Sequence, residues 1–183
     1  MEKIKSTIPN ILTLLNMSLG VIAILLATNS SNDINLLFTA SLLVMIAALT
    51  DRFDGKVARM LGKTSELGKE LDSLADLISF GVAPIIITWR ISFMHLGIPG
   101  YILALIFPMA GAYRLARFNV TTFDNFFIGM PITIAGAFLS IANLFNWFAY
   151  VNNKITSIHS IVTAAFTVLL SYFMICRIKI KKR

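Results

Sequence analysis

The chain has 183 residues, of which 57% are hydrophobic and only 14% are charged. Because soluble domains carry roughly 25% charged residues, this composition and a mean hydropathy of +0.79 exclude an ordinary soluble protein and indicate a lipid-facing surface. The formal net charge of +7 does not indicate a nucleic-acid-binding protein, because the basic residues are spread over short segments between apolar runs.

Six apolar segments follow one another along the chain, at residues 8–28, 35–60, 69–89, 99–118, 129–150 and 155–177. Each is close to the ~20 residues that a helix needs to cross a bilayer. None alternates with a period of two, as the strands of a membrane barrel would, so helices are expected. The sequence therefore predicts an all-α polytopic membrane protein in which residues 1–183 form a single domain of six transmembrane helices.

The basic residues predict how these helices are oriented. If the N-terminus is cytoplasmic, all 16 lysines and arginines except Arg90 and Lys154 fall on the cytoplasmic side. By the positive-inside rule, the side of a membrane protein with the excess of lysine and arginine faces the cytoplasm. Both termini are therefore expected in the cytoplasm, in a multi-pass protein of the cell membrane.

The second and third segments carry acidic residues at unusual depth. The apolar or weakly polar run of the second segment covers only residues 36–50, which as a helix span about 22 Å of the ~30 Å hydrocarbon core. It must continue through Asp51 and Asp54 to cross, and the third segment begins with Asp72 and Asp76. Charged groups at this depth are costly and usually face the interior of a bundle or a wet cavity.

Helical spacing gathers these aspartates on two facing surfaces. Spacings of three and four return to one side of a helix, and they relate two sets of residues here: Asp51, Asp54, Gly55 and Ala58, then Gly68, Asp72 and Asp76. A short turn at residues 61–67 lets both faces meet, so four carboxylates from antiparallel helices point into one pocket. Divalent cations would remove their repulsion, and oxygen ligands select Mg²⁺, Mn²⁺ or Ca²⁺ rather than zinc. Gly55, Ala58 and Gly68 leave room for the flat base and the pyrophosphate of a nucleotide. Small residues are, however, also common where membrane helices pack closely.

Residues 51–76 fit the pattern D-x2-D-G-x2-A-R-x8-G-x3-D-x3-D at every fixed position. This segment resembles the signature of the CDP-alcohol phosphotransferase family. The resemblance implies a six-helix membrane fold with two divalent cations, usually as a homodimer. It implies metal ligation by Asp51, Asp54, Asp72 and Asp76, with Asp76 also acting as the base that activates the acceptor hydroxyl. It places the CDP moiety against Gly55 and Ala58, with Arg59 on the phosphate side and Gly68 nearby. Asn10 and Thr13 could also contact the nucleotide, although Asn10 equally fits a helix cap.

Three further stretches, at residues 9–16, 111–119 and 127–131, resemble the phosphatidylserine synthase branch of this family, with Met130 where the branch often has leucine. In that branch the acceptor is L-serine and the donor is CDP-diacylglycerol or the archaeal CDP-archaeol. Arg114 and Arg117 lie at the depth of the aspartates, where either can bind the serine carboxylate or a lipid phosphate. Asn119 and Lys63 are weaker candidates for the same role. The alternative is that both arginines are anchors that reach toward the headgroups.

The sequence thus predicts a metal-dependent enzyme of phospholipid biosynthesis that transfers a phosphatidyl or archaetidyl group to L-serine and releases CMP. An alternative is the same reaction with another acceptor, such as glycerol 3-phosphate or an inositol. A membrane transporter is the hypothesis from another class. It would need acidic residues strung across the membrane, whereas these cluster toward one side.

Overall fold

The computed structural model describes residues 2–31, 33–60, 66–120, 126–154, 156–176 and 179–181; within these ranges, the side chains of residues 2–9, 53–60, 126–128 and 179–181 are outside the description. The long helices are α1 (Glu2–Thr28), α2 (Asn35–Met60), α5 (Ile98–Val120), α6 (Ile132–Val151) and α7 (Ser157–Ile175). The remaining long helix, the third span, runs from Glu66 to Leu96. It consists of α3 (Glu66–Asp76), a π-helical turn (Leu77–Val82), α4 (Ala83–Thr88), a second π-helical turn (Trp89–Phe93) and a 3₁₀ turn (Met94–Leu96).

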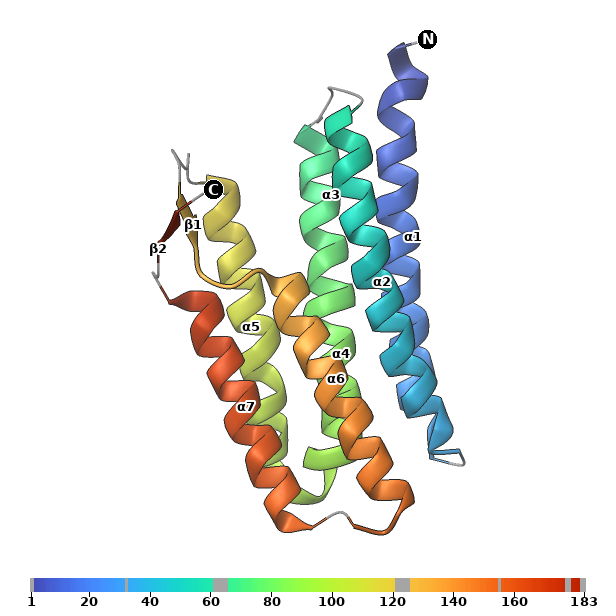
Figure 1. Cartoon of the computed structure of the whole chain (residues 1–183), viewed down its shortest axis with the longest axis vertical. Coiled ribbons are helices and arrows are strands. Elements are labelled where there is room, and N and C mark those ends of the chain that lie inside the picture. The colour runs from blue at the N-terminus through green and yellow to red at the C-terminus, as the bar shows by residue number, and fades with distance from the viewer. Residues whose placement is uncertain are drawn as a thin grey trace.

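The expected helical membrane architecture is confirmed. Among the described residues, 6 helices are long and apolar enough to cross a membrane. They run along one bundle axis, and α1 begins at the same end at which α7 finishes (Figure 1), as an even number of crossings requires. The chain is therefore a multi-pass membrane protein.

Several helix boundaries differ from those expected from the sequence. The third span extends to Leu96 rather than ending at residue 89, because the apolar sequence after Arg90 continues the helix. The helix α6 begins at Ile132, after Pro131 in an extended conformation (φ −57°, ψ 139°). The helix α7 ends at Ile175 because Cys176 leaves the helical region (φ −57°, ψ 141°).

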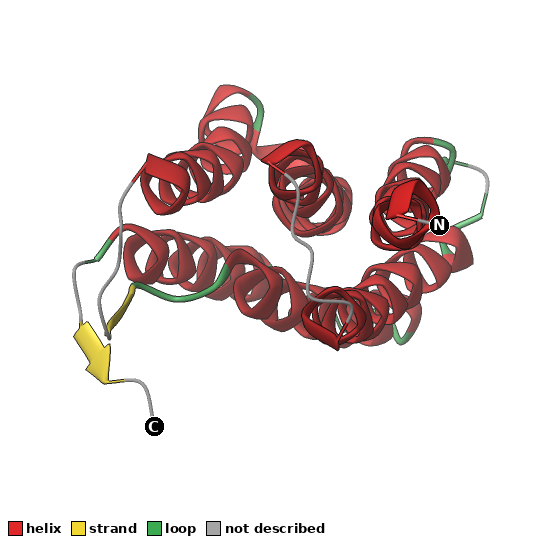
Figure 2. Cartoon of the chain, turned by 90° about the horizontal axis from the view of Figure 1, so that it is seen from above, coloured by secondary structure: helices red, strands yellow, loops and turns green. Residues whose placement is uncertain are grey.

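Two short strands, β1 (Phe126–Ile128) and β2 (Lys179–Lys181), were not expected from the sequence. They pair in antiparallel register, with Phe127 opposite Ile180. The pair lies at the edge of the helix bundle and outside it (Figure 2), next to the ends of α5 and α7 (Figure 1). It connects the segment between α5 and α6 with the segment after α7, and it leaves the helical class of the fold unchanged.

The third span is the central element, since its first π-helical turn contacts α1, α5 and α6. Its buried polar groups are paired with its neighbours. The Ser79 hydroxyl donates to the Asn16 carbonyl on α1 (2.9 Å). On the other side, the Asn143 amide of α6 donates to the Pro84 carbonyl (2.9 Å), and Thr88 donates to Asn143 Oδ1 (2.8 Å). In an apolar interior such bonds fix neighbouring helices in register, and here they hold the helix that carries Asp72 and Asp76.

Candidate metal centre

Three carboxylates meet at one end of the bundle. Asp51 lies on α2, and Asp72 and Asp76 lie one turn apart on α3, which runs antiparallel to α2 (Figure 1). One oxygen from each carboxylate lies within 4.8 Å of the other two. Asp72 is exposed, whereas Asp51 and Asp76 are half-buried. Three of the four carboxylates that helical spacing predicted to point into one pocket therefore do lie together, and the cluster extends from the surface into the bundle.

The environment of Asp76 fits a bound cation. Its Oδ1 is buried and has no hydrogen-bond partner among the described residues. The carboxylate interacts with the negative charges of Asp51 and Asp72 and with the positive charge of Arg114. A buried, unpaired oxygen beside two further carboxylates carries a desolvation cost and a repulsion that a divalent cation removes. The donor set consists of hard oxygens, which suits Mg²⁺, Mn²⁺ or Ca²⁺.

Thr133 is a neighbour of this cluster that the sequence analysis missed. It lies in the first turn of α6, and its hydroxyl donates to Asp51 Oδ2 over a long 3.5 Å. The position follows Pro131, which commonly marks the start of a helix. A polar residue directly after that start was the signal available in the sequence, but its proximity to Asp51 is a property of the tertiary fold.

Arg114 on α5 faces the same cluster. Its side chain is buried, with 9% exposed, and it interacts with the charge of Asp76. Its Nε has no hydrogen-bond partner among the described residues. A buried guanidinium with an unused N–H beside a carboxylate cluster can bind an anionic group of a substrate.

Arg117, three residues further along α5, has a different setting. Its Nη1 donates to the Ile175 carbonyl at the end of α7 (2.9 Å). Its guanidinium also lies 5.8 Å from the centre of the Tyr113 ring. A cation at the carboxyl end of a helix pairs with the last carbonyl groups and with the helix dipole. Arg117 therefore joins α5 to α7.

Asn119 joins the end of α5 to α3. Its amide donates to Ser73 Oγ (3.0 Å) and to Glu70 Oε1 (3.3 Å). Its own carbonyl accepts from Lys69 Nζ at 3.5 Å. These contacts hold α3 against α5 within one turn of Asp72.

The other predicted site residues have these positions. On α1, Thr13 is buried and Asn10 is half-buried, and Gly68 is half-buried on α3. Four belong to helix α2, but their side chains lie outside the described part: Asp54, Gly55, Ala58 and Arg59. Lys63 lies outside the described residues altogether.

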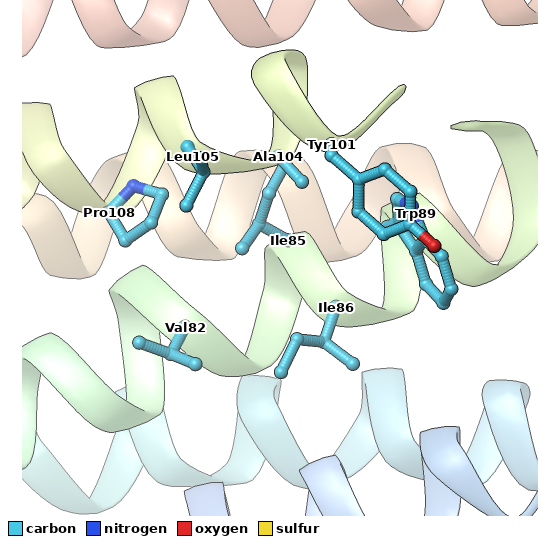
Figure 3. A pocket seen from close by; sticks show the side chains of 8 residues that line it. All are labelled: Val82, Ile85, Ile86, Trp89, Tyr101, Ala104, Leu105 and Pro108. Atoms are coloured by element: carbon cyan, nitrogen blue, oxygen red, sulfur yellow. The ribbon is translucent and has the colours of Figure 1, made fainter. Parts of the chain in front are cut away.

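A separate apolar groove lies deeper in the bundle, between the third span and α5 (Figure 3). Its volume is about 320 Å³. The lining residues are Val82, Ile85, Ile86 and Trp89 of the third span and Tyr101, Ala104, Leu105 and Pro108 of α5. Its lining residues offer no carboxylate or cation, so this groove is separate in its chemistry from the carboxylate cluster.

Comparison with known proteins identifies relatives along almost the whole chain. Residues 6–175 match the family model of the CDP-alcohol phosphatidyltransferases. The chain is 37% identical to the CDP-diacylglycerol–serine O-phosphatidyltransferase of Bacillus subtilis, over 94% of this chain and 88% of that protein. It is 37% identical to the enzyme of the same name from Helicobacter pylori, over 74% of this chain and 56% of the relative.

An archaeal relative carries a related name. The chain is 38% identical to the archaetidylserine synthase of Methanothermobacter thermautotrophicus, over 76% of this chain and 59% of that protein. The chain thus spans little more than half the length of the Helicobacter and Methanothermobacter relatives. The extent of these matches, together with the helical fold and the carboxylate cluster, shows that the chain belongs to the CDP-alcohol phosphatidyltransferase family.

Proposed function

We propose that this protein transfers the phosphatidyl group of a CDP-linked lipid to the hydroxyl of L-serine and releases CMP. The observation that carries the proposal is the meeting of Asp51, Asp72 and Asp76 beside the buried Arg114, in a chain whose bacterial and archaeal relatives are named for serine transfer. A carboxylate cluster suits a metal-bound pyrophosphate, and an adjacent cation suits an acceptor that carries its own carboxylate.

In this proposal Asp51, Asp54, Asp72 and Asp76 hold two divalent cations. When bound, such cations neutralise the pyrophosphate and the charge that develops on the departing CMP. Asp54 takes this role from its place in the sequence pattern. The Thr133 hydroxyl orients Asp51 by donating to its second oxygen, as groups behind a metal ligand commonly do.

Asp76 is the proposed base, and Arg114 binds the acceptor. The guanidinium of Arg114 pairs with the serine carboxylate and holds the serine hydroxyl toward the cluster. The hydroxyl oxygen forms a bond to the lipid-side phosphorus while the bond from that phosphorus to the CMP oxygen breaks. The hydroxyl proton passes to Asp76, whose Oδ1 is not used by another described residue.

The nucleotide is proposed to lie against α2, where the sequence pattern has the small residues Gly55 and Ala58, with Arg59 on the phosphate side. Asn10, Thr13 and Gly68 border the same region. Arg117 and Asn119 support the acceptor site indirectly, because both are engaged in joining α5 to its neighbours. Lys63 remains a candidate for a phosphate contact.

We further propose that the carboxylate end faces the cytoplasm and that the protein works in the cell membrane as a homodimer of a single-domain chain. The charge distribution supports the orientation, since the lysines and arginines other than Arg90 and Lys154 fall on the carboxylate side of the membrane segments. The proposed donor is CDP-diacylglycerol or CDP-archaeol, and the experiment below compares the two.

The test is CMP release by the purified protein with either donor and with serine, glycerol 3-phosphate or inositol as acceptor, in the presence and absence of Mg²⁺ or Mn²⁺. We expect serine- and metal-dependent release that falls about 10²–10⁴-fold in Asp76→Asn. Asp33→Asn is a matched control, because Asp33 is exposed at the other end of the bundle, where its Oδ1 accepts from the backbone amide of Asn35 (2.9 Å). Release with another acceptor would reject serine, and metal-independent release would reject the carboxylate site.

A further inference from the structure

A second charged position lies at the opposite end of the third span. Arg90 follows Asp76 by 14 positions on this helix, a rise of about 20 Å. It is half-buried. A cation near the end of a membrane helix on the side poor in basic residues runs against the charge distribution of the rest of the chain. A charged side chain at such a position usually pairs with another charged or polar group.

The partners of Arg90 in the described part of the protein are all neutral. Its Nε donates to Ser30 Oγ (3.1 Å) and its Nη2 to Ser31 Oγ (2.7 Å), both in the connection between α1 and α2. Its Nη1 contacts Met94 Sδ at 2.6 Å. A guanidinium offers five N–H groups, so N–H groups remain available. The guanidinium is thus held in place while its charge is not neutralised by these contacts.

A polar hollow adjoins this guanidinium. It is lined by Ser30, Ser31 and Ile34, by Arg90 and by Tyr150 in the last turn of α6, and its volume is about 320 Å³. Ser31 and Tyr150 add hydroxyl groups that can donate to an anion. A planar guanidinium flanked by hydroxyl donors matches the oxygen atoms of a phosphate group, which an arginine can bind through two parallel hydrogen bonds.

We infer that this hollow, formed by Arg90, Ser31 and Tyr150, binds a phosphate-bearing anion at the end of the bundle opposite the carboxylates. The anion is either the phosphodiester of a lipid headgroup in that leaflet or free phosphate, since the same contacts recognise both. The competing explanation is that Arg90 only ties the α1–α2 connection to the third span through its serine contacts. That explanation predicts a loss of stability in an Arg90 variant but no dependence on phosphate.

The experiment measures thermal unfolding of the purified protein in a neutral detergent, with EDTA present so that metal-dependent binding at the carboxylates does not contribute. Phosphatidylglycerol, phosphatidylcholine and inorganic phosphate are each titrated into wild type, Arg90→Gln and Lys154→Gln. Lys154 is the matched control, because it is the other basic residue on this side and is exposed. We expect phosphatidylglycerol at saturating excess to raise Tm by roughly 5–10 °C in wild type and Lys154→Gln, and by far less in Arg90→Gln.

The three ligands distinguish the sources of phosphate. A shift with phosphatidylglycerol alone, or with both phospholipids, assigns a lipid headgroup, and a shift with inorganic phosphate assigns the free ion. Equal shifts in wild type and Arg90→Gln with every ligand, or no shift in wild type, would overturn the inference. If Arg90→Gln does not fold, Ser31→Ala and Tyr150→Phe each remove one hydroxyl from the hollow and keep the arginine. Each is expected to weaken the apparent affinity several-fold, and unchanged affinity in both would likewise overturn the inference.

Discussion

Arg114 and Arg117 lie one turn apart on α5, and they serve different regions of the molecule. Arg114 is buried beside the carboxylate cluster and keeps an unused Nε. Arg117 donates instead to the last carbonyl of α7. The two arginines share residue type, helix and depth, so the sequence did not distinguish their roles. The difference comes from what each side chain meets, a site for chemistry on one side and a helix end on the other.

This contrast separates the proposed catalytic region around α2, α3 and Arg114 from a supporting region where α5, α7 and the segment before α6 meet. The catalytic region combines like charges with an unpaired buried oxygen, which costs stability in the absence of ligands. In the supporting region the described contacts are hydrogen bonds between helix ends and loops. Substitutions in the first region should change activity more than stability, and those in the second should do the reverse.

The sharpest test of this division is Arg114→Gln. Loss of a charged hydrogen bond to the serine carboxylate is worth about 1.5–3 kcal/mol, so kcat/KM for serine should fall roughly 10–100-fold. The effect should depend on the carboxylate of the acceptor. Ethanolamine has the hydroxyl and amine of serine without the carboxylate, and the preference of the wild type for serine over ethanolamine should largely disappear in the variant. Equal losses with both acceptors would show that Arg114 acts on the structure of the site rather than on serine.

The largest effect in the supporting region is expected for Gly129→Ala. Gly129 has a positive φ of +76°, and an added Cβ would lie 2.6 Å from the Met174 carbonyl oxygen. Strain of this kind costs on the order of 1–3 kcal/mol, so Tm should fall by several degrees while the residual activity of the folded fraction stays near wild type. Gly97→Ala shares the strain of a positive φ (+64°), but its Cβ would meet nothing within 4 Å, so it should lose less Tm, and the difference between the two variants measures the contact with Met174. A loss of kcat without a loss of Tm in Gly129→Ala would contradict the division.

A smaller loss of stability is expected for Arg117→Gln. The substitution removes the charged donor from the Ile175 carbonyl and the favourable interaction with the end of α7, together about 1 kcal/mol. Thermal unfolding should shift down by a few degrees, and kcat/KM for serine should stay within about twofold of wild type. Arg117→Lys, which keeps the charge, should recover part of the loss. If Arg117→Gln instead lost serine preference as Arg114→Gln does, the two arginines would share the acceptor site after all.

Much of the fold was predictable from the sequence, because a membrane leaves few architectures open. Only helices or closed barrels satisfy the hydrogen-bonding groups of the backbone in lipid. The lengths of the apolar segments were therefore enough to identify the helices. Spacings of four on a helix brought Asp72 and Asp76 to one face, and the short connection to α2 brought Asp51 to them. These relations are local, and local relations are what sequence patterns report most directly.

The missed features are all non-local. The first π-helical turn of the third span ends at Val82, two positions before Pro84, whose carbonyl accepts from Asn143, 59 positions away in the chain. The position of Arg117 depends on where α7 ends, 58 positions further on. No periodicity within one helix carries this information. The roles assigned to Asp54, Gly55 and Ala58 still rest on the sequence pattern.

Thr133→Val gives the smallest expected effect and tests whether the catalytic region extends to α6. Valine keeps the shape of threonine but cannot donate to Asp51 Oδ2, which lies 82 positions away in sequence. A neutral hydrogen bond contributes about 1 kcal/mol, and this one is long, so we expect a two- to fivefold increase in the Mg²⁺ concentration that gives half-maximal CMP release. Tm should change little, and Thr133→Ser should behave as wild type. An unchanged Mg²⁺ dependence in Thr133→Val would mean that Asp51 is held by α2 alone and that α6 belongs entirely to the supporting region.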